Sequence, residues 1–234
     1  QNKVTKKFLN ELKINKIKDL GNLKLVENTY DKQDYINNKL NIQFKKYKTW
    51  IAASTHTNEE VFCAKAHIEL KKKNKNLITI IIPRHVHRVQ DIISQIQKLN
   101  LKVVTHSSKM KTLKNVDIYI VDTFGDSQKF FKISNTVLMG KFLITKGSQN
   151  PLEAVRYGAK ILHGPNFDNF TDIFKLLKSL KISKRITSIR QLITEITFKK
   201  DMRRGLKIKK IGVLILKKTL KELEIYINNE PKKT

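Results

Sequence analysis

Short apolar runs, each followed by a polar turn and a helix-like segment, recur along most of this chain. The clearest run, residues 77–82, is continuous and rich in isoleucine, which is typical of a central parallel strand covered on both faces. Further strand-like runs lie at 50–53, 101–104, 116–121, 136–139 and 160–162. Apolar residues at three- and four-residue spacing predict helices at 59–70, 89–99, 128–133, 151–157 and 170–180. This alternation predicts an α/β fold with a Rossmann-like, doubly wound parallel sheet.

The chain divides by composition into three parts. Residues 1–48 are polar and rich in Lys and Asn, and we interpret them as an interdomain lead-in from an N-terminal domain missing from this sequence. Residues 49–198 form the predicted Rossmann-like domain, and residues 199–234 a long C-terminal helical tail. An apolar stripe on the tail should be buried against the sheet, against a neighbouring domain or on a membrane surface. The stripe consists of Val213, Leu216, Leu220, Leu223 and Ile227.

The chain is strongly basic: 48 Lys and Arg residues stand against 20 Asp and Glu residues, for a formal net charge of +28. The basic residues occur in nearly every segment, which favours a general compositional bias over one patch built for a polyanion. A net attraction to phosphate-rich surfaces follows all the same. The single cysteine, Cys63, allows no internal disulfide, and no apolar run is long enough to cross a bilayer, so a cytosolic setting is expected.

Polar turns follow the predicted strands, and in a doubly wound sheet the strand ends share one edge where ligands bind. Ser54 and Thr55 follow the first strand, and their hydroxyl and amide groups could hold a phosphate oxygen. Arg84 and His85 follow the second strand. The guanidinium is a planar fork suited to phosphate or carboxylate, and the imidazole can donate a hydrogen bond or carry a proton.

Two later turns extend the same edge. Phe124, Gly125 and Asp126 follow the fourth strand-like run, and Gly125 would let the backbone approach a flat base closely. Asn150 stands before a proline that suits a helix start, where backbone N–H groups favour a phosphate. Glu153, in the first turn of that helix, could accept hydrogen bonds from a sugar diol. Together these turns predict a ligand crevice at one edge of the sheet, compatible with many ligands.

Each turn also has an ordinary structural interpretation. Ser, Thr and Asp side chains cap helices in many proteins, and Asn58 is a candidate cap for the helix at 59–70. Glu153 could only stabilise a helix dipole, and Arg84 could lie in a solvated turn. Arg88 is expected at the exposed start of the next helix. These alternatives stay open on composition alone.

Other chemistries lack their sequence signals. Neither a GxGxxG run nor a GxxxxGK[ST] run occurs, which argues against a standard dinucleotide site or P-loop. The histidines and Cys63 lack metal-ligand spacing, and Cys63 lies on an apolar helix face, as a structural thiol would. We therefore expect chemistry without a metal or a cofactor.

Taken in order, these segments resemble the C-terminal half of 3-deoxy-D-manno-octulosonic acid (Kdo) transferases, a family of GT-B glycosyltransferases. The resemblance spans about residues 6–228. No single motif is specific, but several occur in the same order at predicted strand ends. The matching segments are residues 21–24, 50–56 with 59–60, 82–85, 122–126, 147–153, 164–165 and 169–170.

The resemblance implies a two-domain enzyme whose C-terminal domain binds the donor CMP-Kdo. Its N-terminal domain would hold the lipid A precursor and the catalytic base, so no catalytic residue is expected in this chain. Arg84 and His85 would face the donor's phosphate or carboxylate, Gly125 and its loop the cytidine, and Asn150 and Glu153 the phosphate and ribose. The donor-binding residues implied are Ser54, Thr55, Arg84, His85, Phe124, Gly125, Asp126, Asn150 and Glu153.

The same resemblance implies an inverting, metal-free transfer in lipopolysaccharide synthesis, at the cytoplasmic face of the bacterial inner membrane. The implied partners are a CMP-sugar donor, a lipid A precursor and an anionic membrane surface, with no specific nucleic acid. Two alternatives stay open. One is another GT-B sugar-nucleotide transferase, and the other is a non-enzymatic basic Rossmann-like domain that binds RNA or anionic lipid.

The chain departs from the family's pattern at three places. Gly140-Lys141-Phe142 stands where the family usually has Gly-Gly-Ser, Ser148-Gln149 where it has Gly-His, and Asp126-Ser127 where it has Glu-Leu. Lys141 in place of glycine could crowd the donor loop or add charge to it, and Gln149 removes one polar contact. We expect these changes to alter donor affinity.

Overall fold

The computed structural model describes residues 3–14, 17–26, 35–141, 143, 149–165 and 170–228. The chain divides into two compact units, one of residues 33–204 and one of residues 1–32 with 205–234. The first, larger unit contains the entire sheet of the described residues. The second, smaller unit contains most of the long C-terminal helix.

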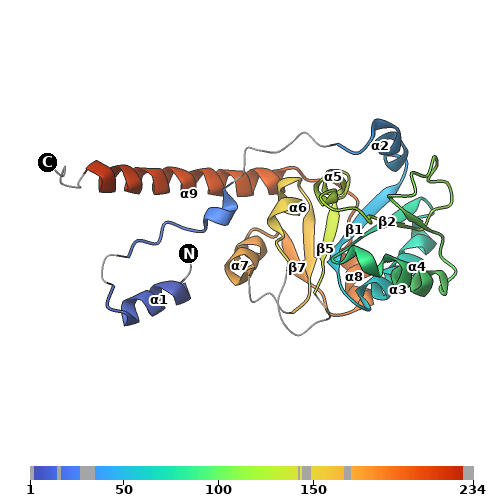
Figure 1. Ribbon diagram of the computed structural model, residues 1–234, viewed down its shortest axis with the longest axis horizontal. Helices are drawn as coiled ribbons and strands as arrows, with labels where there is room; N and C mark the ends of the chain where they lie inside the picture. The colour runs from blue at the N-terminus through green and yellow to red at the C-terminus, as the bar shows by residue number, and fades with distance from the viewer. Residues whose placement is uncertain are drawn as a thin grey trace. The chain divides into compact units, whose positions relative to one another are not determined.

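Seven parallel strands form one sheet in the described residues of the larger unit, in the order β3-β4-β2-β1-β5-β6-β7 (Figure 1). The strands are β1 (Lys48–Thr55), β2 (Leu77–Pro83), β3 (Val103–Thr105), β4 (Ile118–Ile120), β5 (Thr136–Met139), β6 (Lys160–His163) and β7 (Ser183–Arg185). Connections after β1 lead toward β3, whereas those after β5 lead toward β7. This confirms the doubly wound sheet and puts its switch point between the neighbours β1 and β5.

Helices cover both faces of the sheet, as right-handed crossovers in two directions require. Side chains of α3 (Glu59–Lys73), α4 (Val89–Gln97) and α8 (Ile189–Glu195) join one hydrophobic cluster on the first face. The return connections carry α5 (Ser127–Phe131), α6 (Leu152–Arg156) and α7 (Thr171–Ser179) on the second face. Here Phe44 of α2 (Asn38–Phe44) packs edge-on against Phe130 of α5.

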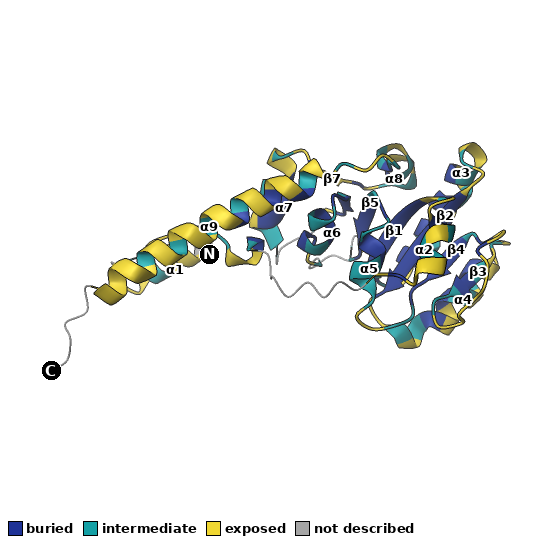
Figure 2. Ribbon diagram, turned by 90° about the horizontal axis from the view of Figure 1, so that it is seen from above, coloured by how far each residue is buried: buried dark blue, intermediate teal, exposed yellow. Residues whose placement is uncertain are grey.

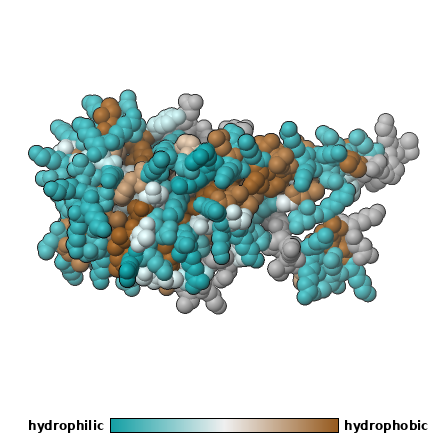
Figure 3. All heavy atoms as spheres, turned by 180° about the vertical axis from the view of Figure 1, so that it is seen from behind, coloured by the Kyte–Doolittle hydropathy of each residue, from teal (hydrophilic) through white to brown (hydrophobic). Residues whose placement is uncertain are grey.

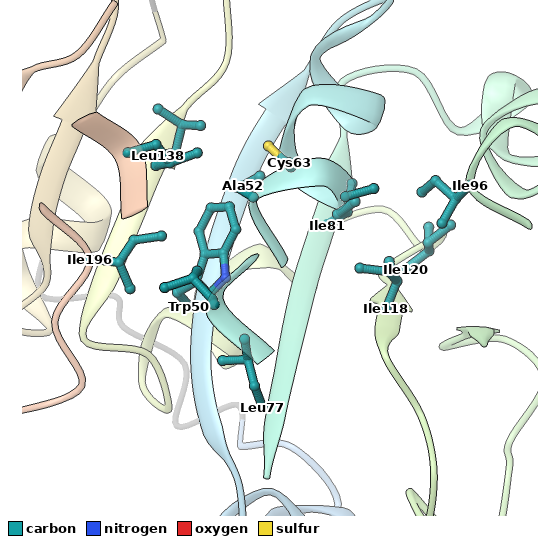
Figure 4. Close-up of a cluster of buried hydrophobic side chains, with 14 of the residues drawn as sticks. Trp50, Ala52, Cys63, Leu77, Ile81, Ile96, Ile118, Ile120, Leu138 and Ile196 are labelled. Atoms are coloured by element: carbon teal, nitrogen blue, oxygen red, sulfur yellow. The ribbon is translucent and has the colours of Figure 1, made fainter. Parts of the chain in front are cut away.

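The core is formed by the central strands, which lie as a buried layer between the helices (Figure 2). Figure 4 shows part of the cluster on the α3 side, where Trp50 of β1 and Ile81 of β2 lie beside Cys63 of α3. β2 is buried along its whole length, as its unbroken apolar sequence predicts. Burial raises the pKa of the Cys63 thiol, and the neighbouring carboxylates of Glu59 and Glu60 raise it further, which fits the predicted structural role.

Three elements of the larger unit escape the sequence-based prediction. α2 lies in the segment interpreted as a lead-in, and its seven residues are too few to show a helical period. β7 is an edge strand with two exposed basic residues, so its sequence lacks a strand-like apolar run. α8 is another seven-residue helix and follows β7 after a short turn.

The predicted cap of α3 is also wrong. Asn58 does stand at the N-cap position, but its φ is 70° and its side chain makes no capping hydrogen bond. The carboxylate of Glu59 instead accepts a hydrogen bond from the backbone N–H of His56, at 2.9 Å. The other predicted strands and helices of the larger unit occur with ends shifted by at most three residues; β5 matches at both ends, and α6 is Leu152–Arg156.

The smaller unit consists of α1 (Lys3–Glu11), the short helix η1 (Leu23–Leu25) and most of α9 (Arg203–Asn228). η1 packs directly on α9 at Gly212, where an added Cβ would lie 2.4 Å from the backbone oxygen of Leu25. Lys18 also pairs with Glu222 across the unit. The predicted C-terminal helix is therefore present, with contacts from the polar N-terminal segment.

The predicted apolar stripe on α9 is not covered in the structure. Its five residues, Val213 to Ile227, are between 38% and 68% exposed, and Figure 3 shows apolar side chains gathered along this helix. Ile208 and Gly212, nearer the start of α9, are buried instead. None of the described helices combines the length and the apolar character needed to span a membrane.

Candidate functional site

A pocket of about 360 Å³ opens at the carboxyl ends of β1, β2 and β4. Five of the nine predicted donor-binding residues line this pocket, and they come from three separate turns. They are Ser54, Arg84, His85, Phe124 and Gly125. We call it the rim pocket. The sheet order thus brings together residues that lie up to 71 positions apart in the chain.

At the β1/β5 switch point, the backbone at the end of β1 and the backbone just after β5 lie in contact and form the floor of the site. Ser54, the last residue but one of β1, lies in the left-handed region, with a φ of 55°. Gly140 follows β5 and donates its N–H to the backbone oxygen of Ala53 at 2.7 Å. A Cβ on Gly140 would lie 1.9 Å from the backbone oxygen of Ser54, so only glycine fits there. The two turns are therefore held in backbone contact.

Glu59 links these two turns through hydrogen bonds to their backbone N–H groups. Its carboxylate is fully buried and accepts hydrogen bonds from the backbone N–H groups of His56 at 2.9 Å, Lys141 at 3.0 Å and Leu143 at 3.0 Å. Bonds from N–H groups to a buried carboxylate are among the stronger hydrogen bonds in proteins. Glu59 thus fixes the turn after β1 relative to the turn after β5.

Glu60, the next residue of α3, fixes a third turn. It is 1% exposed and binds the Arg88 guanidinium with both oxygens, at 3.0 and 3.2 Å. Thr55 is fully buried and donates its hydroxyl to the same carboxylate at 2.9 Å. Two predictions are corrected here: Thr55 does not line the pocket, and Arg88 is not a solvated helix start, because both side chains hold the buried Glu60.

Several positive charges lie around His56 at this edge of the sheet. Burial lowers the pKa of His56 to about 4, and the positive charges of Lys141, His85, Arg88 and Arg84 contribute to the shift. His56 is therefore neutral at pH 7. Its buried Nε2 has no hydrogen-bond partner among the described residues, and its ring meets that of His85 edge-on at 5.9 Å. Such a field favours an anionic ligand.

The loop after β4 forms the opposite wall of the rim pocket. Phe124 is 86% exposed, which makes its ring available for stacking on a flat base. Gly125 has a φ of 82°, in the left-handed region that favours glycine, whereas an added Cβ would meet no other atom. Glycine is therefore favoured here by the backbone conformation and not by lack of space. Asp126 accepts the Thr123 hydroxyl at 2.5 Å and pairs with Lys129 at 2.7 Å. Asp126 shapes this loop rather than lining the pocket.

Asn150 and Glu153 lie at the start of α6, which follows β5 and so begins at the same edge of the sheet. The side-chain Oδ1 of Asn150 accepts the N–H of Leu152 at 3.1 Å, just before α6, whose N-cap is Pro151. Glu153 is half-buried in the first turn. Neither residue lines the rim pocket, and Phe142 with residues 144–148, including the predicted Gly147-Ser148 turn, lies outside the described residues.

The sequence analysis did not identify the buried residues that support the turns of the site. Glu59, Glu60 and His56 stand in the matching segments, but charge alone does not show that a carboxylate is buried. The available signal was the pair of acidic residues at the start of a helix that is otherwise packed on the sheet. Buried carboxylates need partners, and here the partners lie in the turns after β1, β2 and β5.

Lys141 occupies a position that favours glycine. Its φ is 66°, and a side chain in the left-handed region costs on the order of 1 kcal/mol or more. We expect Lys141→Gly to raise the free energy of unfolding by about 0.5–1 kcal/mol, since relief of this strain exceeds the added entropy of the unfolded chain. Urea unfolding measures it. Lys98→Gly, at a φ of −61°, is the control and should give no gain. Equal effects of both changes would contradict the strain at Lys141.

Within the described part of the chain, no group of three or more His, Cys, Asp or Glu side chains could hold a metal ion. Three histidine rings lie near one another: the centroids of His56 and His85 are 5.9 Å apart, and those of His85 and His87 are 5.6 Å apart. The expectation of metal-free chemistry stays a prediction.

A doubly wound parallel sheet with a polar pocket beside its switch point defines a Rossmann-like α/β domain, and a long C-terminal helix follows it in the chain. No protein-family model matches the chain. Its sequence is similar to curated Kdo transferases. It is 27% identical to that of Rickettsia conorii over 222 residues, which are 94% of this chain and 48% of that protein.

Two further Kdo transferases match over shorter stretches. Identity is 29% over 163 residues to the protein of Haemophilus influenzae, covering 69% of this chain and 38% of that protein. Identity is 31% over 167 residues to the protein of Rickettsia typhi, covering 71% of this chain and 36% of that protein. The chain thus spans less than half the length of these relatives.

The solved C-terminal CMP-Kdo binding domain of WaaA from Acinetobacter baumannii has the same fold. The TM-score is 0.61 at 19% identity, and the match covers 75% of this chain and 91% of that domain. At this identity the likeness shows the fold alone. In sequence and in fold together, the chain resembles the C-terminal domain of a Kdo transferase.

Proposed function

We propose that this domain binds the CMP-sugar donor CMP-Kdo for a Kdo transferase. The observation that carries the proposal is the rim pocket, where Arg84, His85 and Phe124 meet beside the β1/β5 switch point. Its positive field suits the phosphate and the carboxylate of the donor, and the exposed ring of Phe124 suits the cytosine. The sequence similarity to Kdo transferases selects this donor over other sugar nucleotides.

Within this proposal each element has one role. Arg84 binds an anionic group of the donor with its planar guanidinium. Gly125 and Phe124 hold the base, and Asn150 with Glu153 contacts the phosphate and ribose from the start of α6. Glu59 and Glu60 do not touch the donor; they position the turns that do.

The proposed reaction of the whole protein is an inverting, metal-free transfer of Kdo to a lipid A precursor. The proposed setting is the cytoplasmic face of the bacterial inner membrane, where the basic surface would contact anionic lipid. The formal net charge of +28 supports a phosphate-rich surface as partner. Whole-protein activity on that acceptor, in the presence and absence of EDTA, tests the metal-free reaction.

Isothermal titration of the folded chain with CMP tests donor binding. We expect saturable binding of CMP, which UDP and GDP displace only weakly. The Arg84→Ala, Glu153→Ala double variant should bind CMP at least tenfold more weakly. The loss follows because hydrogen bonds to charged groups contribute roughly 1.5–3 kcal/mol each. The control is the double variant Lys184→Ala, Glu69→Ala, which removes one exposed positive and one exposed negative charge. It should leave the CMP affinity unchanged. Binding equal in all variants would refute the donor-site assignment.

A further inference from the structure

A second and larger cavity, of about 650 Å³, lies in the larger unit at the opposite edge of the sheet. It is lined by the start of β1, by the residues just before β5, by α2 and α5, and by the segment before α9. Figure 1 shows α2 and α5 near the start of β1. We call it the amino-edge cavity. None of the predicted donor-binding residues lines it.

Lysines dominate the charged groups of this cavity. Lys45, Lys48, Lys129, Lys132 and Lys200 line it, and among the described residues that line it none is a carboxylate. Asp126 pairs with Lys129 of this lining, whereas Asp201 pairs with Arg203, which is not part of it. With Lys129 paired to Asp126, the charge of the lining is still positive on balance, and a positive potential of this kind favours an anionic group.

Three of these lysines have side-chain contacts that hold them in place. The Lys132 ammonium lies 4.3 Å from the ring centroid of Tyr35 and 5.3 Å from that of Tyr157. Lys200 donates to the backbone oxygen of Lys132 at 2.6 Å, and Lys48 lies 5.4 Å from the ring centroid of Phe198. Cation–π contacts of this kind attract the ammonium to the ring face and so favour one position of the side chain.

The walls between the lysines are apolar. They are formed by Ile36, Phe44, Ile133, Phe198 and Met202. Two polar groups of the lining are already used within the protein: the Thr49 hydroxyl donates to the oxygen of Ile133, and the Asn135 amide donates to the oxygen of Phe198. The cavity therefore offers positive charge and apolar contact, but few groups that could recognise the edge of a base or a sugar.

We propose that the amino-edge cavity binds one anionic lipid molecule, with its phosphate on the lysines and part of an acyl chain on the apolar walls. A nucleotide fits less well, because the aromatic faces already carry ammonium groups and the polar groups of the floor are occupied. Inorganic phosphate would leave the apolar walls in water. An amphiphile satisfies both halves of the cavity at once.

The proposal is tested on the 234-residue chain with dihexanoyl phosphatidic acid, kept below its critical micelle concentration. Isothermal titration should give saturable binding that is at least tenfold tighter than that of inorganic phosphate, CMP or dihexanoyl phosphatidylcholine. The Lys132→Gln, Lys200→Gln variant should bind at least tenfold more weakly. The Lys217→Gln, Lys218→Gln variant removes the same charge from α9 and should bind as the unmodified chain does.

A second variant and a second measurement guard against misfolding of the lysine variant. Met202→Gln changes one half-exposed apolar wall residue and should weaken the lipid several-fold while leaving phosphate binding unchanged. Bound phosphatidic acid should also protect Lys132 and Lys200, but not Lys217, from amine acylation read by mass spectrometry. Equal protection of all three lysines, or equal affinity for phosphate alone, would overturn the proposal. Arg84→Ala should not change lipid binding, so this result is separable from donor binding.

Discussion

Glu60→Ala is expected to lower the free energy of unfolding by about 3–5 kcal/mol, because it leaves the Arg88 guanidinium without its partner in a largely buried position. The same change frees the Thr55 hydroxyl, which now donates to Glu60. Because Arg88 ends the turn that begins at Arg84, we also expect weaker CMP binding. Urea unfolding and CMP titration measure the two effects.

The double variant Glu60→Leu, Arg88→Met is the informative companion. It removes both charges together and should recover much of the lost stability, since replacing a buried pair by apolar residues is often close to neutral. It should not recover CMP affinity if the pair positions the turn. A Glu60→Ala change within about 0.5 kcal/mol of the unmodified chain, the range typical of surface substitutions, would contradict the buried pair.

Glu59→Gln is expected to weaken CMP binding at least tenfold and to lower the free energy of unfolding by about 2–4 kcal/mol. The carboxylate accepts three backbone N–H groups, whereas an amide offers one oxygen and turns two donors toward the remaining N–H groups. The turns after β1 and β5 should then separate, which opens the floor of the donor site.

Glu69→Gln is the matched control for this change, because Glu69 lies on the same helix but is half-exposed and pairs only with Lys72. An exposed pair of this type contributes about 0–1 kcal/mol, so neither stability nor CMP affinity should change much. If Glu59→Gln binds CMP as tightly as Glu69→Gln does, Glu59 does not position the donor loops.

The central fold could be predicted because its signals are local. The apolar run of β2 and the spaced apolar residues of α3 and α4 identify buried strands and the helices that cover them. β7 could not be predicted, because an edge strand exposes basic residues and needs no apolar run. The seven-residue helix α2 gives too few turns for periodicity to emerge.

The site was predictable only in part, for a related reason. Arg84, His85 and Phe124 follow strands, and the carboxyl ends of parallel strands must share an edge, so their meeting could be anticipated. The orientation of each side chain could not. Thr55 turns inward to Glu60, and Asp126 turns to Thr123 and Lys129, because these bonds satisfy groups that folding removes from water.

By itself, the sequence determined the order of strands and helices, the polar turns at the strand ends and the resemblance to the C-terminal half of Kdo transferases. Only the tertiary structure decided which carboxylates support those turns and where a second basic cavity forms. The amino-edge cavity takes its walls from segments between residues 35 and 202. Burial and electrostatic potential depend on distances between such segments, and these distances exist only once the sheet has brought them together.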